Sequence, residues 1–218
     1  MKLLKRALAA PIAAAMMAFS IPASAATQSW VLDVWGGSGS QTGPLATVTV
    51  TDNGPLGTSA TVNVQLTAPV VGFVNTGNHT PFAFNLNDAP DSITFNVPPG
   101  ASGFTVGSPP PFPDPSFGDF AYGIFCSSCG AGGSNPNPGP LNFTITDADG
   151  INVNSFIGNA GGWVFAADIL VRGATGAVST NTPAIPEPET YAMMLVGFGL
   201  LGFVARRRRQ AFGNVVPA

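Results

Sequence analysis

Residues 47–55, with the sequence TVTVTDNGP, decide the fold of this chain. Apolar and hydroxyl side chains alternate over residues 47–51, which is the pattern of a strand that buries one face. The next four residues, Asp52-Asn53-Gly54-Pro55, predict a turn because Asn-Gly readily adopts positive φ. The alternation of apolar and polar side chains resumes over residues 60–66. We therefore expect these two strands to form a hairpin.

Short apolar segments recur outward from this hairpin. They cover residues 30–35, 82–86, 92–97, 118–125, 141–146, 151–156 and 163–170. Turn-forming stretches separate them, and no segment between residues 26 and 190 keeps a helical period over three turns. This spacing predicts an all-β fold, an antiparallel β-sandwich that is jelly-roll-like or immunoglobulin-like. The expected core is phenylalanine-rich, with an aromatic-binding cleft as the alternative use of Phe82, Phe84, Phe95, Phe120, Phe125, Phe143 and Phe165.

The first 25 residues have the three parts of a secretory signal peptide. Lys2, Lys5 and Arg6 form a positive region, residues 7–21 are apolar, and Ala23-Ser24-Ala25 is a small-residue cleavage site. We expect an N-terminal signal helix and cleavage by signal peptidase after Ala25, with Ala26 as the next choice. The chain is therefore expected to be exported, with a secreted β-sandwich domain over residues 26–178.

Charge is unevenly spread along the chain. Residues 26–183 hold nine aspartates, no glutamate, no lysine and one arginine, Arg172, so their net charge is 1 − 9 = −8, against −3 for the whole chain. A negative surface with a single cation cannot neutralise phosphates. We therefore expect neither nucleic acid nor an anionic lipid surface as a partner of the domain.

The C-terminal part of the chain combines prolines, an apolar run and arginines. Residues 179–189 form a linker that contains Pro186-Glu187-Pro188, and residues 190–205 carry no charge. As a helix this run reaches only about 24 Å, less than the bilayer core of about 30 Å. We predict a single, marginal transmembrane helix over residues 190–205. The arginines Arg206, Arg207, Arg208 and Arg209 would stop it and hold a cytoplasmic tail, residues 206–218.

This order of Pro-Glu-Pro, short apolar helix and arginine cluster resembles the PEP-CTERM sorting signal of Gram-negative exosortase substrates. The resemblance implies that an exosortase, an integral-membrane processing enzyme, recognises Pro186, Glu187 and Pro188 and removes the tail. It implies an inner-membrane-anchored precursor that is then released to the cell surface or the extracellular matrix. The alternative is an ordinary C-terminal anchor. The chain departs from the pattern because residues 210–218 follow the arginines.

The middle of the chain is also similar to ectodomains that precede such tails. The similarity rests on residues 79–86, on the Cys126-Ser127-Ser128-Cys129-Gly130 loop and on residues 165–169. It implies no activity. For Cys126 and Cys129 we expect a structural disulfide, because export favours disulfides and the following Gly130 does not open a helix. A metal half-site, a redox pair and free thiols are the alternatives.

Candidate catalytic and metal-binding residues are few. His79 is the single histidine, no Gly-x-Ser-x-Gly motif accompanies it, and we expect a loop histidine. Asp147-Ala148-Asp149-Gly150 resembles the start of a calcium loop, but Asn152 and Gly158 stand where an EF-hand needs glycine and glutamate. A turn is favoured there, and calcium stays open. We therefore expect no enzyme, no cofactor and no metal.

The expected role is structural or adhesive, within exopolysaccharide or biofilm material, an association that comes from the family resemblance. The alternative is a carbohydrate-binding module that stacks exposed aromatic rings on sugars, for which the candidates are Trp30, Trp35, Tyr122 and Trp163. A secreted hydrolase is a further alternative. It would require an open cleft that holds two or more aspartates, or His79 in altered surroundings.

Overall fold

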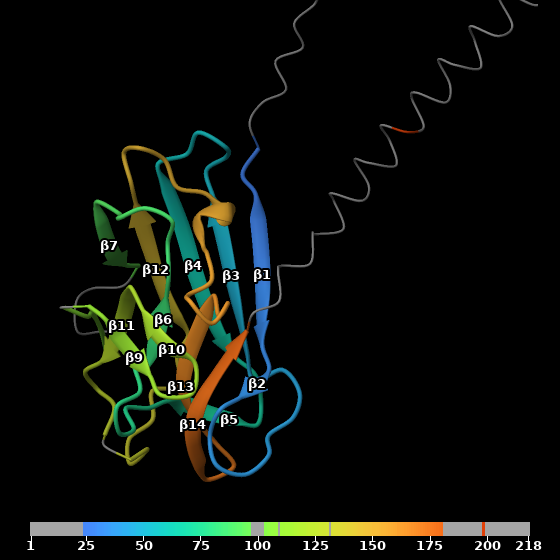
Figure 1. The fold of residues 1–218 in the computed structure, drawn as a ribbon, viewed down its shortest axis with the longest axis vertical. Coiled ribbons are helices and arrows are strands. Elements are labelled where there is room, and N and C mark those ends of the chain that lie inside the picture. Colours follow the sequence, from blue (N-terminus) through green and yellow to red (C-terminus); the bar gives the residue numbers. More distant parts are fainter. Residues whose placement is uncertain (1–23, 97–102, 109, 131, 181–197, 199–218) are drawn as a thin grey trace, which may run out of the picture.

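The computed structural model describes residues 24–96, 103–108, 110–130, 132–180 and 198. Their architecture is all-β and antiparallel, as predicted (Figure 1). Sheet A has the order β1 (Thr27–Leu32), β3 (Ala46–Asp52), β4 (Ser59–Leu66), β12 (Leu141–Thr146), β7 (Ser92–Phe95). Sheet B has the order β2 (Val34–Trp35), β14 (Ala174–Thr180), β13 (Phe165–Val171), β6 (Phe82–Phe84), β11 (Tyr122–Cys126), β8 (Phe104–Val106), and β5 (Val70–Phe73) also pairs with β13.

Sheet A contains the hairpin that the alternation predicts. β3 and β4 pair antiparallel with Val48 opposite Val64, and buried and more exposed residues alternate along both strands. Gly54 closes the turn at φ 98°, where the lack of a Cβ avoids strain, and its carbonyl accepts a hydrogen bond from Gly57 N. The valines face sheet B and the threonines face outward, which makes sheet A a half-buried layer.

The core between the sheets is rich in phenylalanine, as expected. Phe82, Phe84, Phe143 and Phe165 are fully buried, and the ring centroids of Phe84 and Phe143 lie 5.6 Å apart. Two of the seven predicted core phenylalanines lie elsewhere. Phe120 belongs to a second cluster, described next, and Phe125 is 39% exposed because its side chain lies on the outer face of β11.

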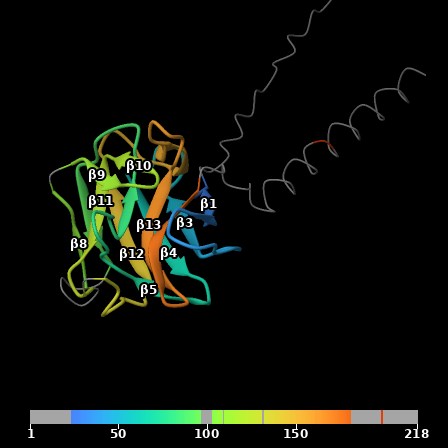
Figure 2. The same ribbon diagram turned by 60° about the horizontal axis from the view of Figure 1, so that its bottom comes forward.

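A second cluster lies on the outer face of sheet B. The hairpin of β9 (Phe112–Asp114) and β10 (Gly118–Phe120) packs there (Figure 2). Its phenylalanines cover Ala83, Ala166 and Ala177, which come from three strands of sheet B. The strands of sheet B under this hairpin, β6, β13 and most of β14, are therefore buried on both faces, and β13 is apolar along most of its length without alternating.

Several sequence predictions of strands were wrong in detail. Residues 151–156 contain a 3₁₀ turn, Val153–Ser155, because the Asn152 side chain accepts a hydrogen bond from Asn154 N and caps it. The predicted strand over residues 118–125 is split between β10 and β11. β14 continues to Thr180, two residues into the segment assigned to the linker.

Both hydrophobic ends of the chain lie mainly outside the described residues. This applies to residues 1–23 of the expected signal peptide, to the linker from residue 181, to the expected transmembrane helix and to the arginine-rich tail. Within the described ranges, no helix is long and apolar enough to span a bilayer.

Candidate functional site

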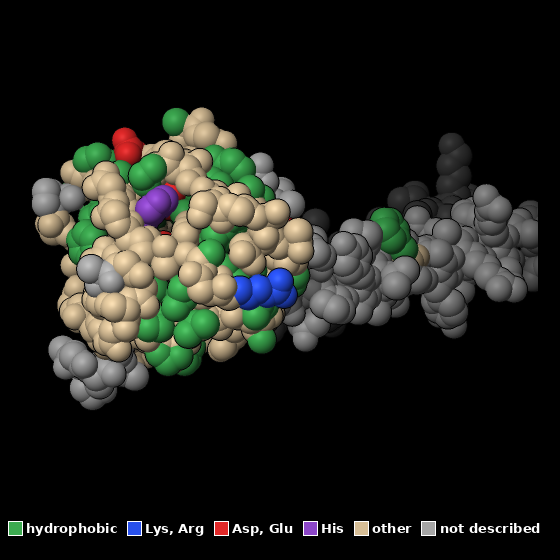
Figure 3. Space-filling view, turned by 90° about the horizontal axis from the view of Figure 1, so that it is seen from below, with side chains coloured by type: hydrophobic (Ala, Val, Ile, Leu, Met, Phe, Trp, Pro, Cys, Tyr) green, Lys and Arg blue, Asp and Glu red, His purple; other side chains and the backbone are tan. Residues whose placement is uncertain are grey.

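Titratable side chains of the β domain meet where the loop after β5 reaches the β9–β10 hairpin. His79 Nδ1 lies 3.3 Å from Asp114 Oδ1, at the end of β9. The Thr80 hydroxyl donates to Pro113 O at 3.1 Å, which ties the loop to the hairpin. Figure 3 shows the imidazole at the surface, with a carboxylate partly covered beside it. In this pair the His79 side chain is partly exposed, at 19%, and the Asp114 side chain is fully buried.

Asp168 holds the other end of the same loop. Its Oδ2 accepts hydrogen bonds from Thr76 N at 2.7 Å and from the Thr76 hydroxyl at 2.6 Å. The Asp168 carbonyl accepts a hydrogen bond from Val74 N, and Asp168 N donates one to Pro81 O. β13 is therefore bonded to the loop on both sides of His79. Asp168 lies on the outer face of β13, in line with Ala166, and is completely buried. We name His79, Asp114 and Asp168 the acid–histidine cluster.

Burial dominates the electrostatics of this cluster. It raises the pKa of Asp168 to about 6, although the Thr76 hydrogen bonds and His79 lower that pKa, and the nearby Asp114 raises it further. Burial likewise raises the pKa of Asp114, against the hydrogen bond from Ser116 and the attraction of His79. Asp114 Oδ2 and Asp168 Oδ1 are buried and have no hydrogen-bond partner among the described residues. Both carboxyls are therefore easier to protonate than an exposed aspartate.

An aspartate–histidine pair alone does not make a hydrolase. Nucleophilic catalysis needs a hydroxyl or thiol activated by the imidazole, with the carboxylate as the orienting group. Among the described residues, the only side-chain partner of the His79 ring is Asp114. The cluster therefore has a base and an orienting acid without a bound nucleophile. Sequence reasoning singled out His79 but missed its partners, because they lie 35 and 89 positions away and no motif links them.

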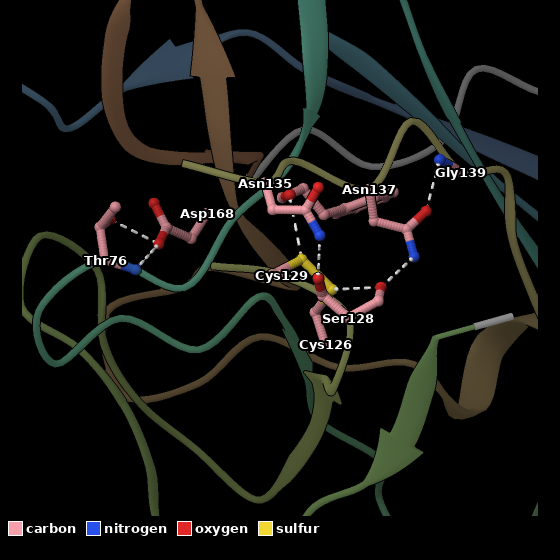
Figure 4. The surroundings of a disulfide bond; sticks show 9 residues. Thr76, Cys126, Ser128, Cys129, Asn135, Asn137, Gly139 and Asp168 are labelled. Atoms are coloured by element: carbon pink, nitrogen blue, oxygen red, sulfur yellow. Dashed lines mark hydrogen bonds between the residues drawn. A yellow bond between two sulfur atoms is a disulfide. The ribbon is translucent and has the colours of Figure 1, made fainter. Parts of the chain in front are cut away.

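The two cysteines form a disulfide, with their Cα atoms 5.3 Å apart (Figure 4). Cys126 ends β11 and is buried, and the loop after it is held by amide side chains. Asn135 Nδ2 donates to Ser128 O, and Asn137 Nδ2 donates to the Ser128 hydroxyl at 3.1 Å. The disulfide therefore lies in a turn that is also held by hydrogen bonds, as a disulfide with a structural role does.

The segment from Asp147 to Gly150 is a turn. Asp147 Oδ1 accepts a hydrogen bond from Asp149 N, Asp147 O accepts one from Gly150 N, and Gly150 has φ 108°. Across the described ranges, no three His, Cys, Asp or Glu side chains are grouped closely enough to hold a metal ion. One oxygen of the Asp147 carboxylate is thus already used in a hydrogen bond within the turn.

The four aromatic candidates for sugar binding do not form one platform. Trp30 is 3% exposed, whereas Trp35, Tyr122 and Trp163 are half-buried. Tyr122 stacks on Phe84 of the core, and Trp163 packs edge-on against Phe117. They come from separate parts of the β domain, so a flat stacking surface built from the four is absent.

One groove opens beside the edge strand β1. Its volume is about 390 Å³, and it lies between β1 and residues 153–164. Trp30, Phe156 and Val164 line it together with the side chains of Gln28, Asn154 and Asn159. No charged residue is among its lining residues. Of the sequence candidates, only Trp30 contributes to it.

Asp52 has a structural role that sequence reasoning recognised only as part of a turn. Its Oδ1 accepts hydrogen bonds from Ala26 N and Gly54 N, both at 2.8 Å, and its Oδ2 accepts one from Val153 N at 3.0 Å. The bond to Gly54 is the Asx-turn contact that the sequence implies, but the bond to Val153 spans 101 positions. If cleavage follows Ala25, the bond to Ala26 becomes a charge-assisted contact with the new terminal ammonium.

Comparisons with known proteins give one match, and it lies outside the β domain. No curated protein and no solved structure shows significant similarity to the chain. Residues 184–209 match the family model of the PEP-CTERM protein-sorting motif. The match includes Pro186, Glu187, Pro188 and the four arginines, so the resemblance inferred from their order is confirmed. The chain thus carries, after its β domain, a PEP-CTERM protein-sorting motif.

Proposed function

We propose that this protein is a non-enzymatic component of the cell surface or extracellular matrix of a Gram-negative bacterium. The observation that carries the proposal is the PEP-CTERM motif at residues 184–209, which marks an exosortase-targeted, exported protein. Signal peptidase removes residues 1–25, residues 190–205 hold the precursor in the inner membrane, and exosortase then cleaves near Pro186-Glu187-Pro188. The domain stays outside and takes a structural or adhesive role in exopolysaccharide or biofilm material.

The β domain supports a role without catalysis. Among the described residues, its acid–histidine cluster offers no bound nucleophile, and the buried carboxylates Asp114, Asp147 and Asp168 each accept a hydrogen bond from a backbone N–H group. A net charge of −8 over residues 26–183 disfavours anionic partners, so a neutral polymer suits the domain better than nucleic acid. Carbohydrate binding is the second candidate, and the groove beside β1 is the observation that favours it.

The sorting proposal is tested by the intact mass of the mature protein from a strain with an exosortase. We expect a mass that lacks residues 1–25 and the segment after about Pro188. Glu187→Ala should remain full-length at its C-terminus, because the middle residue of Pro-Glu-Pro is lost. Glu189→Ala is the matched control, since it removes the same charge outside Pro186-Glu187-Pro188. Normal processing of Glu187→Ala, or failure of both variants alike, would reject recognition through this motif.

A further inference from the structure

We propose that the groove beside β1 binds one or two units of a neutral sugar, with the indole Nε1–H of Trp30 donating a hydrogen bond to a sugar oxygen. The proposal gives a binding site to the suggested exopolysaccharide association and takes its biological setting from that proposed function. Its chemistry rests on three features of the groove, which are an unsatisfied donor, two free amides and the absence of charge.

The Trp30 side chain is almost fully buried, and its indole N–H has no acceptor among the described residues. Trp30 is 3% exposed and is fixed by ring contacts with Phe165 and Phe156, at centroid distances of 5.1 and 6.2 Å. Buried tryptophan N–H groups usually have a hydrogen-bond partner. Within the described part of the chain, no residue accepts a hydrogen bond from Trp30 Nε1. Solvent still reaches this atom, unlike the buried polar atoms of the domain that lack a partner. We therefore place the N–H toward the groove that Trp30 lines.

Two side-chain amides complete the polar lining. Gln28, two residues before Trp30 on the same face of β1, makes no side-chain hydrogen bond to the described residues, and neither does the Asn154 side chain. Asn159 is different because its Oδ1 accepts from Gly161 N and Trp163 N, and its Nδ2 donates to Phe117 O and Asp119 O. Asn159 thus fixes the loop that forms one side of the groove. The side chains of Gln28 and Asn154 remain free to exchange hydrogen bonds with the hydroxyl groups of a ligand.

Size and charge select the ligand class. A volume of about 390 Å³ lies at the lower end of small-molecule sites, which run from about 300 to 1,000 Å³. Phe156, Val153 and Val164 supply apolar surface for the C–H faces of a ring, and the indole and amides supply donors and acceptors. A charged ligand would find no counter-charge in the groove, and an anionic one would be repelled by the acidic domain. A neutral pyranose satisfies each of these conditions.

The groove also lies close to where the described domain ends. Val164, one of its walls, donates its backbone N–H to the carbonyl of Thr180 at 3.0 Å. Thr180 is the last residue of β14, so a ligand in the groove would be held beside the start of the segment that leads to the sorting motif. A bound neutral polymer would therefore contact the domain beside the C-terminal end of β14.

The test is NMR of the full chain in detergent, titrated into the millimolar range with glucose, N-acetylglucosamine, maltose and cellobiose. Spectra of Trp30→Phe, Trp35→Phe and Trp163→Phe assign the three indole signals. We expect at least one sugar to move the Trp30 signal and not the other two. Trp30→Phe should weaken binding about three- to tenfold, the equivalent of one hydrogen bond, and Asn154→Ala should weaken it by a similar factor.

Matched controls keep the outcome unambiguous. Trp35→Phe and Gln65→Ala, an amide on the exposed face of β4, should leave the affinity unchanged. The neutral-sugar site would be overturned if none of the four sugars bound, or if Asn154→Ala and the wild type bound equally well. It would also be overturned if only glucuronic acid or a tripeptide shifted the Trp30 signal. Processing is measured separately by mass, so a negative titration leaves the sorting proposal standing, and unprocessed protein can still show binding.

Discussion

The β domain and the sorting segment use charged residues differently. In the domain, Asp52, Asp114, Asp147 and Asp168 are buried, and all four accept hydrogen bonds from backbone N–H groups of nearby loops. In residues 184–209, two glutamates and four arginines flank a run without charge, and their order along the chain is what the family model matches. These four carboxylates thus bond the domain's own loops, whereas we propose that the charges in the segment are recognised by exosortase. Substitutions in the two regions should therefore change different measurements.

The largest effect on the domain is expected for Asp52→Ala. It leaves the N–H groups of Ala26, Gly54 and Val153 without their acceptor, at about 1 kcal/mol for each. The free energy of unfolding should fall by about 3 kcal/mol in urea titrations followed by tryptophan fluorescence. Asp91→Ala is the control, because Asp91 accepts one exposed bond from Ala148 N and should cost less than about 1 kcal/mol. Equal losses for the two variants would contradict the assignment.

The next effect concerns pH and Asp168. Its pKa is about 6 in the folded protein and about 3.8 when exposed, so the folded state binds more protons between these values. The carboxyl therefore lowers stability as pH rises from about 4 to about 6, by about 2 kcal/mol. Asp168→Asn keeps an acceptor for Thr76 and should flatten this slope, which makes the variant more stable at pH 7. An unchanged difference between variant and wild type across this range would refute the buried-acid assignment.

The smallest effect is expected at the disulfide. Cys126 and Cys129 close a loop of very few residues, so their bond removes little entropy from the unfolded chain. The double variant Cys126→Ala/Cys129→Ala should lose about 1 kcal/mol, and a reductant should lower wild-type stability by a similar amount without affecting the variant. A loss larger than that of Asp52→Ala would mean that this turn is central to the fold. In all these domain variants, the C-terminal processing seen by mass should be unchanged.

Sequence reasoning succeeded for the β3–β4 hairpin and β12 of sheet A and for the sorting motif. The single strand predicted over residues 30–35 was wrong, because it is split between β1 and β2, which belong to different sheets. Along β3, β4 and β12, one face meets solvent and the other meets the core, so alternation reveals each strand. The sorting motif is recognised from its linear order, which needs no tertiary structure. In both cases the information lies within a short window of the chain.

The remainder of the fold depends on contacts between distant residues. β14 and β13 are buried on both faces by the core and by the β9–β10 hairpin, so β14, a run of small residues, shows no alternation. β5, β8 and β9 are too short to give a pattern. The acid–histidine cluster and the groove are assembled from segments far apart in sequence, which explains why only His79 and Trp30 were singled out.

The most direct test of the division between domain and sorting segment is a transfer experiment. Residues 179–218 are fused to an unrelated exported β-domain protein, and the intact mass of the fusion is measured in a strain with an exosortase. We predict that the fusion loses the part after about Pro188, and that the same fusion with Glu187→Ala does not. A fusion that stays full-length, while the natural protein is processed in the same strain, would show that the β domain itself takes part in recognition and would contradict this account.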